Sequence, residues 1–147
     1  MLSTERTVRI DRPAHVVFDF LADGSNAPEW RTGVRSISLR SGVGGQVGAE
    51  YAQQLVGPGG RSIPGDYRIT RSDRPGRLEF EVIAGPLRPR GVYSVLTSGA
   101  SSVVTFALTA EPTGFMRLMT RTIRKTMAAE VAQLMTAKRI LEETPTP

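Results

Sequence analysis

The stretch FMRLMTRTIRKTMAAEVAQLMTAKRILEE, residues 115–143, constrains the architecture of this chain more than any other. Its apolar residues recur mostly every three or four positions, which is the spacing of one face of an α-helix. That face carries Met116, Met119, Ile123, Met127, Val131, Leu134 and Leu141. At about 1.5 Å per residue, such a helix would be about 40 Å long, enough to span a small domain. We therefore expect one long C-terminal helix whose apolar face is buried against another element.

The chain before this stretch alternates polar and apolar residues, as strands do when one face is buried. Short segments rich in glycine, proline and serine separate these runs, and such turns join antiparallel neighbours. Seven strands are predicted, at 5–10, 34–39, 51–55, 63–70, 78–82, 91–96 and 102–110. Two short helices are predicted after the first strand, at 13–22 and 26–30, with Pro13 in the first turn of the first one.

A sheet with one apolar face must be covered, and only the helix at 115–143 is long enough to cover it. A strongly curved sheet cannot close fully on one cylinder, so a mostly apolar cavity is expected between sheet and helix. The predicted fold class is α+β: a curved seven-stranded antiparallel sheet wrapped around a long C-terminal helix. With 147 residues, the whole chain, 1–147, is predicted to form one such domain.

Three segments carry a resemblance to known proteins: VRIDRPAHVVFDFLAD at 8–23, NAPEW at 26–30, and the terminal helix. In their order they resemble the START-like helix-grip (SRPBCC) superfamily, in its polyketide cyclase/dehydrase-like branch. The resemblance covers about residues 4–143 and implies a helix-grip fold around an internal cavity. Since that superfamily includes hydrolases, cyclases, transporters and receptors, the fold alone does not choose an activity.

Composition argues against several classes of function. There is no cysteine, and His15 is the only histidine, so thiolate sites and multi-histidine metal sites are excluded. The glycine clusters at 42–45 and 57–60 match neither phosphate-binding nor dinucleotide-binding patterns, and no cofactor is predicted. The net charge is +5, but the sequence lacks a compact basic cluster with stacking aromatics, so nucleic acid is not expected as a partner. A cytoplasmic location is predicted because the first residues are polar and no long apolar run occurs.

Candidate ligand-binding residues follow from the expected cavity. On the apolar faces of strands they are Tyr51, Gln53, Tyr67, Phe80 and Tyr93, and on the last helix Met119, Thr122, Ile123, Thr126 and Met127. Trp30 joins them because the resemblance places a cavity entrance beside it. Methionine adapts to ligands of variable shape, and buried hydroxyl and amide groups need partners. The alternative is that these residues fill the core and hydrogen-bond one another, with Trp30 sealing the short helices to the sheet.

Charged residues offer two further hypotheses. Arg117, Arg121, Arg124 and Lys125 form a basic stripe that is either a solvated face or a contact for an anionic membrane surface or an acidic partner. Glu79 and Glu81 fall on the outer sheet face, where pairing with Arg68 or Arg90 is predicted rather than paired-carboxylate catalysis.

The leading prediction is therefore the binding or carrying of a small hydrophobic ligand, such as a lipid, a polyketide or another apolar metabolite. One alternative is a polyketide cyclase/dehydratase-type enzyme that acts on a ligand in the same cavity. A regulatory module acting through the basic stripe is a third hypothesis. The sequence leaves catalysis open, and it allows a monomer or a homodimer.

Overall fold

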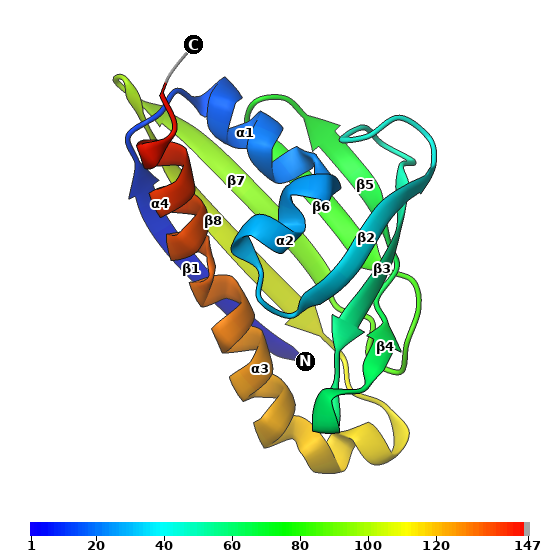
Figure 1. Cartoon of the computed structure of the whole chain (residues 1–147). Coiled ribbons are helices and arrows are strands. Elements are labelled where there is room, and N and C mark those ends of the chain that lie inside the picture. The colour runs from blue at the N-terminus through cyan, green and yellow to red at the C-terminus, as the bar shows by residue number, and fades with distance from the viewer. Residues whose placement is uncertain (146–147) are drawn as a thin grey trace.

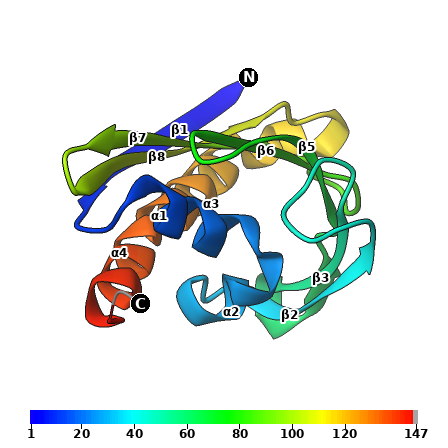
Figure 2. The same cartoon turned by 90° about the horizontal axis from the view of Figure 1, so that it is seen from above.

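A computed structural model describes residues 1–145; Thr146 and Pro147 lie outside the described part. One antiparallel sheet curves around the C-terminal helices (Figures 1 and 2). Its strands are β1 (Leu2–Ile10), β2 (Val34–Ser41), β3 (Glu50–Val56), β4 (Ser62–Pro64), β5 (Tyr67–Asp73), β6 (Arg77–Val82), β7 (Arg90–Ser98) and β8 (Ser101–Ala110). The order across the sheet is β1-β8-β7-β6-β5-β3-β2, and β4 pairs with β3. The predicted helix-grip fold is confirmed.

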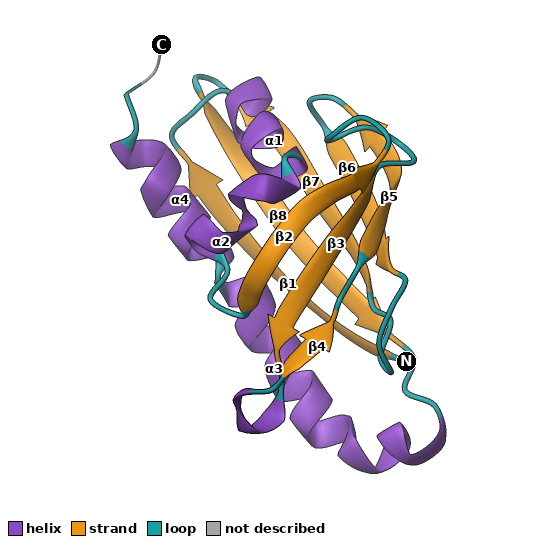
Figure 3. Cartoon of the chain, turned by 45° about the vertical axis from the view of Figure 1, so that its right-hand side comes forward, coloured by secondary structure: helices purple, strands orange, loops and turns teal. Residues whose placement is uncertain are grey.

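Helices fill the concave side of this sheet (Figure 3). They are α1 (Ala14–Ala22), α2 (Ala27–Trp30), α3 (Thr120–Ala132) and α4 (Leu134–Glu143), with 3-10 turns η1 (Gly24–Asn26), η2 (Pro58–Gly60) and η3 (Gly114–Met119). Seen from above, the strands form an arc with the helices inside it (Figure 2). Within residues 1–145, no helix is long and apolar enough to cross a membrane.

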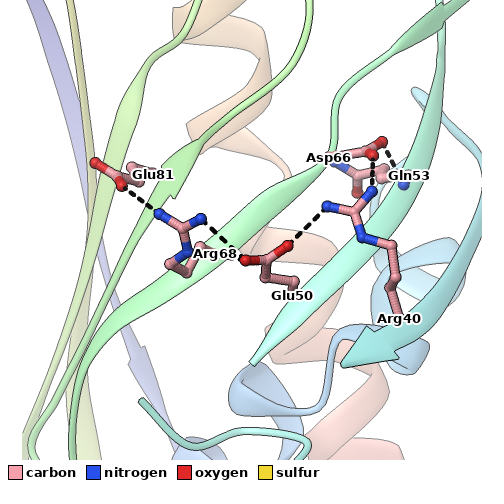
Figure 4. Close-up of polar contacts among 6 residues, drawn as sticks. All are labelled: Arg40, Glu50, Gln53, Asp66, Arg68 and Glu81. Carbon is pink, nitrogen blue, oxygen red and sulfur yellow. Dashed lines mark hydrogen bonds and ion pairs between the residues drawn. The ribbon is translucent and has the colours of Figure 1, made fainter. Parts of the chain in front are cut away.

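The sheet has eight strands rather than the predicted seven because the segment predicted at 63–70 is broken after Pro64. Asp66, at the break, turns its carboxylate outward, where it accepts from the backbone N–H of Gln53 at 3.1 Å and from Arg40 at 2.6 Å. Figure 4 shows these contacts within a network of alternating charges on the outer sheet face. Glu50 and Arg68 continue the network to Glu81, so the predicted pairing of Glu81 with Arg68 is confirmed.

The C-terminal helix is also less regular than predicted. The segment Gly114–Met119 forms 3-10 turns, and the α-helix begins only at Thr120. A second irregularity separates α3 from α4 at Gln133, whose side chain bonds the backbone N–H and the hydroxyl of Thr32. The apolar face nevertheless continues through both helices, since its members are all buried: Ile123, Met127, Val131, Leu134, Ala137 and Leu141. The helix is therefore interrupted where Gln133 bonds the loop before β2, and its core face is not turned away.

Candidate functional site

A cavity of about 490 Å³ lies between the concave sheet face, α2, η3 and α3. Its volume falls within the range of about 300–1,000 Å³ typical of small-molecule sites. Most of its wall is hydrocarbon or aromatic, including Leu55, Ile63, Ile69, Leu78, Val82, Leu87, Phe106, Leu108 and Met116. A space of this kind suits an apolar molecule, because the wall offers few hydrogen-bond partners.

Most of the predicted site residues line this cavity. They are Trp30, Gln53, Tyr67, Phe80, Tyr93, Met119, Thr126 and Met127. The strand members come from β3, β5, β6 and β7, whose alternation turns these side chains to the concave face. Met119, Thr126 and Met127 reach the cavity from the opposite side, from the end of η3 and from α3.

Tyr51, Thr122 and Ile123 do not line the cavity. The ring of Tyr51 is buried behind Tyr67, with ring centroids 5.0 Å apart, and its hydroxyl accepts from the backbone N–H of Gly45 at 3.1 Å. Ile123 is buried in the core, and Thr122 faces outward. These three positions were predicted from strand and helix phase alone, and phase does not say where the core ends and the cavity begins.

Trp30 lies inside the molecule rather than at an open entrance. Its side chain is only 3% exposed and packs edge-on against Tyr93 and Phe106, with centroid distances of 6.3 and 6.2 Å. Tyr93 and Phe106 stack on each other at 4.3 Å. This aromatic cluster joins α2 to β7 and β8 and forms one rigid wall of the cavity.

A charged pair, missed by the sequence analysis, lies in the cavity wall. Arg31 at the end of α2 forms an ion pair with Glu130 of α3, and both side chains are largely buried. Arg31 also donates to the side-chain oxygen of Gln53 at 3.3 Å, and Gln53 in turn donates to the carbonyl of Gly65 at 2.9 Å. Burial opposes the charge on Arg31, but the carboxylate of Glu130 outweighs it and keeps the pKa of Arg31 above its ordinary value.

The hydroxyls of Tyr67 and Tyr93 are the other polar groups of interest in the wall. Burial raises the pKa of each phenol well above its ordinary value of 10.0, so both remain protonated donors. No side-chain hydrogen bond within residues 1–145 involves either hydroxyl, and no fully buried side-chain oxygen there lacks a partner, so both hydroxyl oxygens are accessible from the cavity. Because both side chains line the cavity, these two groups can donate to an oxygen of a bound ligand.

Arg31 and Glu130 carried little sequence signal, because isolated charged residues are most often exposed. The only hint is that Arg31 directly follows Trp30 in the segment that carries the resemblance.

Across residues 1–145, no group of three or more acidic or histidine side chains could hold a metal ion.

The chain thus combines a helix-grip fold with an apolar cavity between the sheet and the helices. The family model described as "Polyketide cyclase / dehydrase and lipid transport" matches residues 1–138, and the chain belongs to this family. A search of curated proteins finds no match.

Solved structures agree in fold at low sequence identity. TTHA0849 from Thermus thermophilus has a TM-score of 0.79 at 19% identity, covering 95% of this chain and 96% of that chain. The Zhui aromatase/cyclase from Streptomyces sp. R1128 has a TM-score of 0.77 at 13% identity, covering 95% and 93%. A START superfamily protein from Mycobacterium smegmatis has a TM-score of 0.76 at 12% identity, covering 96% and 97%. At these identities the likeness concerns the fold alone. The family model over residues 1–138, together with this fold, confirms the predicted superfamily.

Proposed function

We propose that this protein binds and carries a small hydrophobic molecule, such as a lipid, a polyketide or another apolar metabolite. The observation that carries the proposal is the cavity of about 490 Å³, whose wall is apolar apart from a few side chains. An empty apolar cavity of this size costs stability because the groups that line it lack contacts, and a ligand would restore them.

The polar groups in the wall indicate what the ligand carries. Tyr67, Tyr93 and Arg31 supply donors, so we propose that the ligand has an oxygen acceptor at one position. The charge of Arg31 is already offset by Glu130. A ligand carboxylate would have to compete with that buried carboxylate, and a neutral oxygen would not.

Binding is tested with the neutral fluorescent probe N-phenyl-1-naphthylamine. Met127 lines the cavity, whereas Met135 on α4 is 43% exposed, so Met127→Trp and Met135→Trp form a matched pair. Saturable binding is expected in the wild type and in Met135→Trp, with affinity at least about tenfold lower in Met127→Trp because the indole occupies the cavity. Absence of saturable binding, together with no apolar compound in extracts of the native protein, would refute the proposal.

A second candidate function is catalysis of the polyketide cyclase/dehydratase type. The observation that favours it is that Tyr67, Tyr93 and Arg31 line the same cavity, where their donors would polarise a carbonyl of a substrate held folded by the walls. Tyr67→Phe and Tyr93→Phe are each expected to reduce turnover of an aromatic-polyketide precursor by about tenfold or more. Tyr51→Phe is the control, because the Tyr51 hydroxyl is bound to Gly45 outside the cavity. Equal turnover in all three variants would exclude this role.

The cytoplasmic location and the monomeric or homodimeric state stay predictions.

A further inference from the structure

The cavity reaches the surface along η3. Phe115 and Met119 both line the cavity and face solvent, with exposed fractions of 70% and 37%. Between them, Leu118 is 90% exposed. Large apolar side chains are thus concentrated at one opening, where contact with water is unfavourable.

Cations surround the same apolar residues. Arg117, Arg121, Arg124 and Lys125 are all exposed, and none of them forms an ion pair within residues 1–145. No acidic residue occurs between Glu111 and Glu130, and Glu130 is neutralised by Arg31. We call these four cations, together with Phe115, Leu118 and Met119, the η3–α3 rim; it lies at the lower end of the molecule in Figure 1.

The other side of the opening has a similar character. Val56, at the end of β3, lines the cavity and is partly exposed. Arg61 is exposed just beyond it, and Arg35 donates to the carbonyl of Gly60 at 2.8 Å. Apolar side chains flanked by cations therefore lie on both sides of the opening.

We infer that the η3–α3 rim docks onto an anionic membrane surface, with Phe115 and Leu118 entering the boundary between headgroups and acyl chains. Amphipathic segments bind membranes through buried apolar area and through attraction of Lys and Arg to anionic lipids. The exposed apolar residues favour a bilayer over an acidic protein, because a bilayer offers hydrocarbon next to its negative charges. In this orientation the cavity opens toward the lipid, which gives an apolar ligand a route that avoids water.

The rim contains none of the polar wall residues Arg31, Tyr67 and Tyr93. Membrane docking and ligand binding can therefore be tested independently of each other. Co-sedimentation is measured with phosphatidylcholine vesicles, with and without about one third phosphatidylserine. The wild type is expected to sediment with the anionic vesicles only, and added salt is expected to weaken that binding through screening.

Two matched pairs of variants locate the contact. Arg121→Gln with Lys125→Gln removes two rim charges, and Arg6→Gln with Arg139→Gln removes two exposed charges from β1 and α4. Leu118→Ser removes the exposed apolar side chain, and Leu96→Ser does so on β7, where Leu96 is 65% exposed. Each removed rim charge is expected to weaken vesicle binding about fivefold, and Leu118→Ser about tenfold, while both controls bind like the wild type. All these positions are on the surface, and thermal unfolding verifies that each variant is folded.

Absence of binding to anionic vesicles overturns the inference and leaves an acidic protein as the occupant of the rim. Equal loss in the rim variants and their controls also overturns it. So does a dimer that Leu118→Ser dissociates, because the rim would then be covered by a second copy of this chain. Probe binding in the cavity, measured on the same samples, shows separately whether the proposed carrier function holds.

Discussion

Gly91 on β7 leaves room for an aromatic side chain of the cavity wall. It lies directly opposite Phe80 of β6, whose ring covers the glycine. A methyl group at position 91 would overlap that ring. We therefore expect Gly91→Ala to push Phe80 into the cavity, to lower the free energy of unfolding by about 1–3 kcal/mol and to weaken probe binding.

The matched control is Gly76→Ala, because a methyl group there would meet nothing closer than 3.8 Å. Its effect on the free energy of unfolding is expected to stay within about 0.5 kcal/mol. Denaturant unfolding measures both variants. If the two substitutions lower the free energy of unfolding equally, the position of the Phe80 ring does not require a glycine at position 91.

Tyr67 and Tyr93 predict how stability changes in alkali. Their phenols have raised pKa values in the folded protein, so the unfolded chain loses these protons at lower pH than the folded one. Their contribution is complete below about pH 10 and declines as pH rises further, by up to about 1.4 kcal/mol per pH unit for each group. Between about pH 9 and pH 11, the wild type is expected to lose about 2 kcal/mol more than a variant with both tyrosines changed to phenylalanine. Denaturant unfolding measures both proteins. If their free energies of unfolding fall equally over this pH range, the burial of these phenols is contradicted.

For single residues, alternation along the strands was enough to place Gln53, Tyr67, Phe80 and Tyr93 in the cavity wall. Alternation could not show that Tyr51 lies outside the wall, because Tyr51 also points to the concave face of the sheet. There the ring of Tyr67 stacks on it and covers it. Arg31 and Glu130 were missed because their pairing joins residues 99 positions apart. Only the fold, which brings the end of α2 within ion-pair distance of α3, makes a charge at either position favourable.

Among the α-helices of residues 1–145, α2 is the shortest, with four residues, and it has no side-chain cap. The ion pair of Arg31 with Glu130 fastens its end to α3. Glu130→Gln would leave the Arg31 charge largely buried without its counter-ion, and we expect it to cost about 3 kcal/mol. The double variant Arg31→Met with Glu130→Met should recover most of this loss, because no buried charge is then left over.

A double-mutant cycle by denaturant unfolding measures this coupling. Glu29→Gln, an exposed carboxylate of the same helix, serves as the control and is expected to cost less than about 0.5 kcal/mol. Additive losses for Arg31→Met and Glu130→Met would show that the two helices are not joined through this pair.

The helices also show how far the apolar pattern reaches. The spacing predicted the buried face from Ile123 to Leu141, and that face is continuous. The interruption at Gln133 coincides with its hydrogen bonds to Thr32, which lies in a loop distant in the sequence, and the apolar spacing carries no sign of that contact. The 3-10 turns at 114–119 were missed because Phe115, Met116 and Met119 keep a helical spacing even where they face a cavity and solvent instead of a core.

For the whole molecule, the antiparallel pairing and the cavity follow from one apolar sheet face and the C-terminal helices that cover it, which is why the sequence predicted them. Ligand binding should couple these parts energetically, because the cavity wall is drawn from strands, α2 and α3 together. A ligand that binds only the folded state adds about 2.7 kcal/mol at a hundredfold excess over its Kd. With N-phenyl-1-naphthylamine as ligand, the midpoint of thermal unfolding should rise steadily with probe concentration.

Met127→Trp provides the internal comparison for this coupling, because its indole occupies the same space as the probe. Its unfolding midpoint should stay nearly constant over the probe concentrations that stabilise the wild type, whereas Met135→Trp should respond like the wild type. A rise of equal size in all three proteins would mean that the probe binds elsewhere on the surface. The stabilisation would then have to be assigned to the exposed apolar rim instead of the cavity, which Leu118→Ser would reveal by abolishing it.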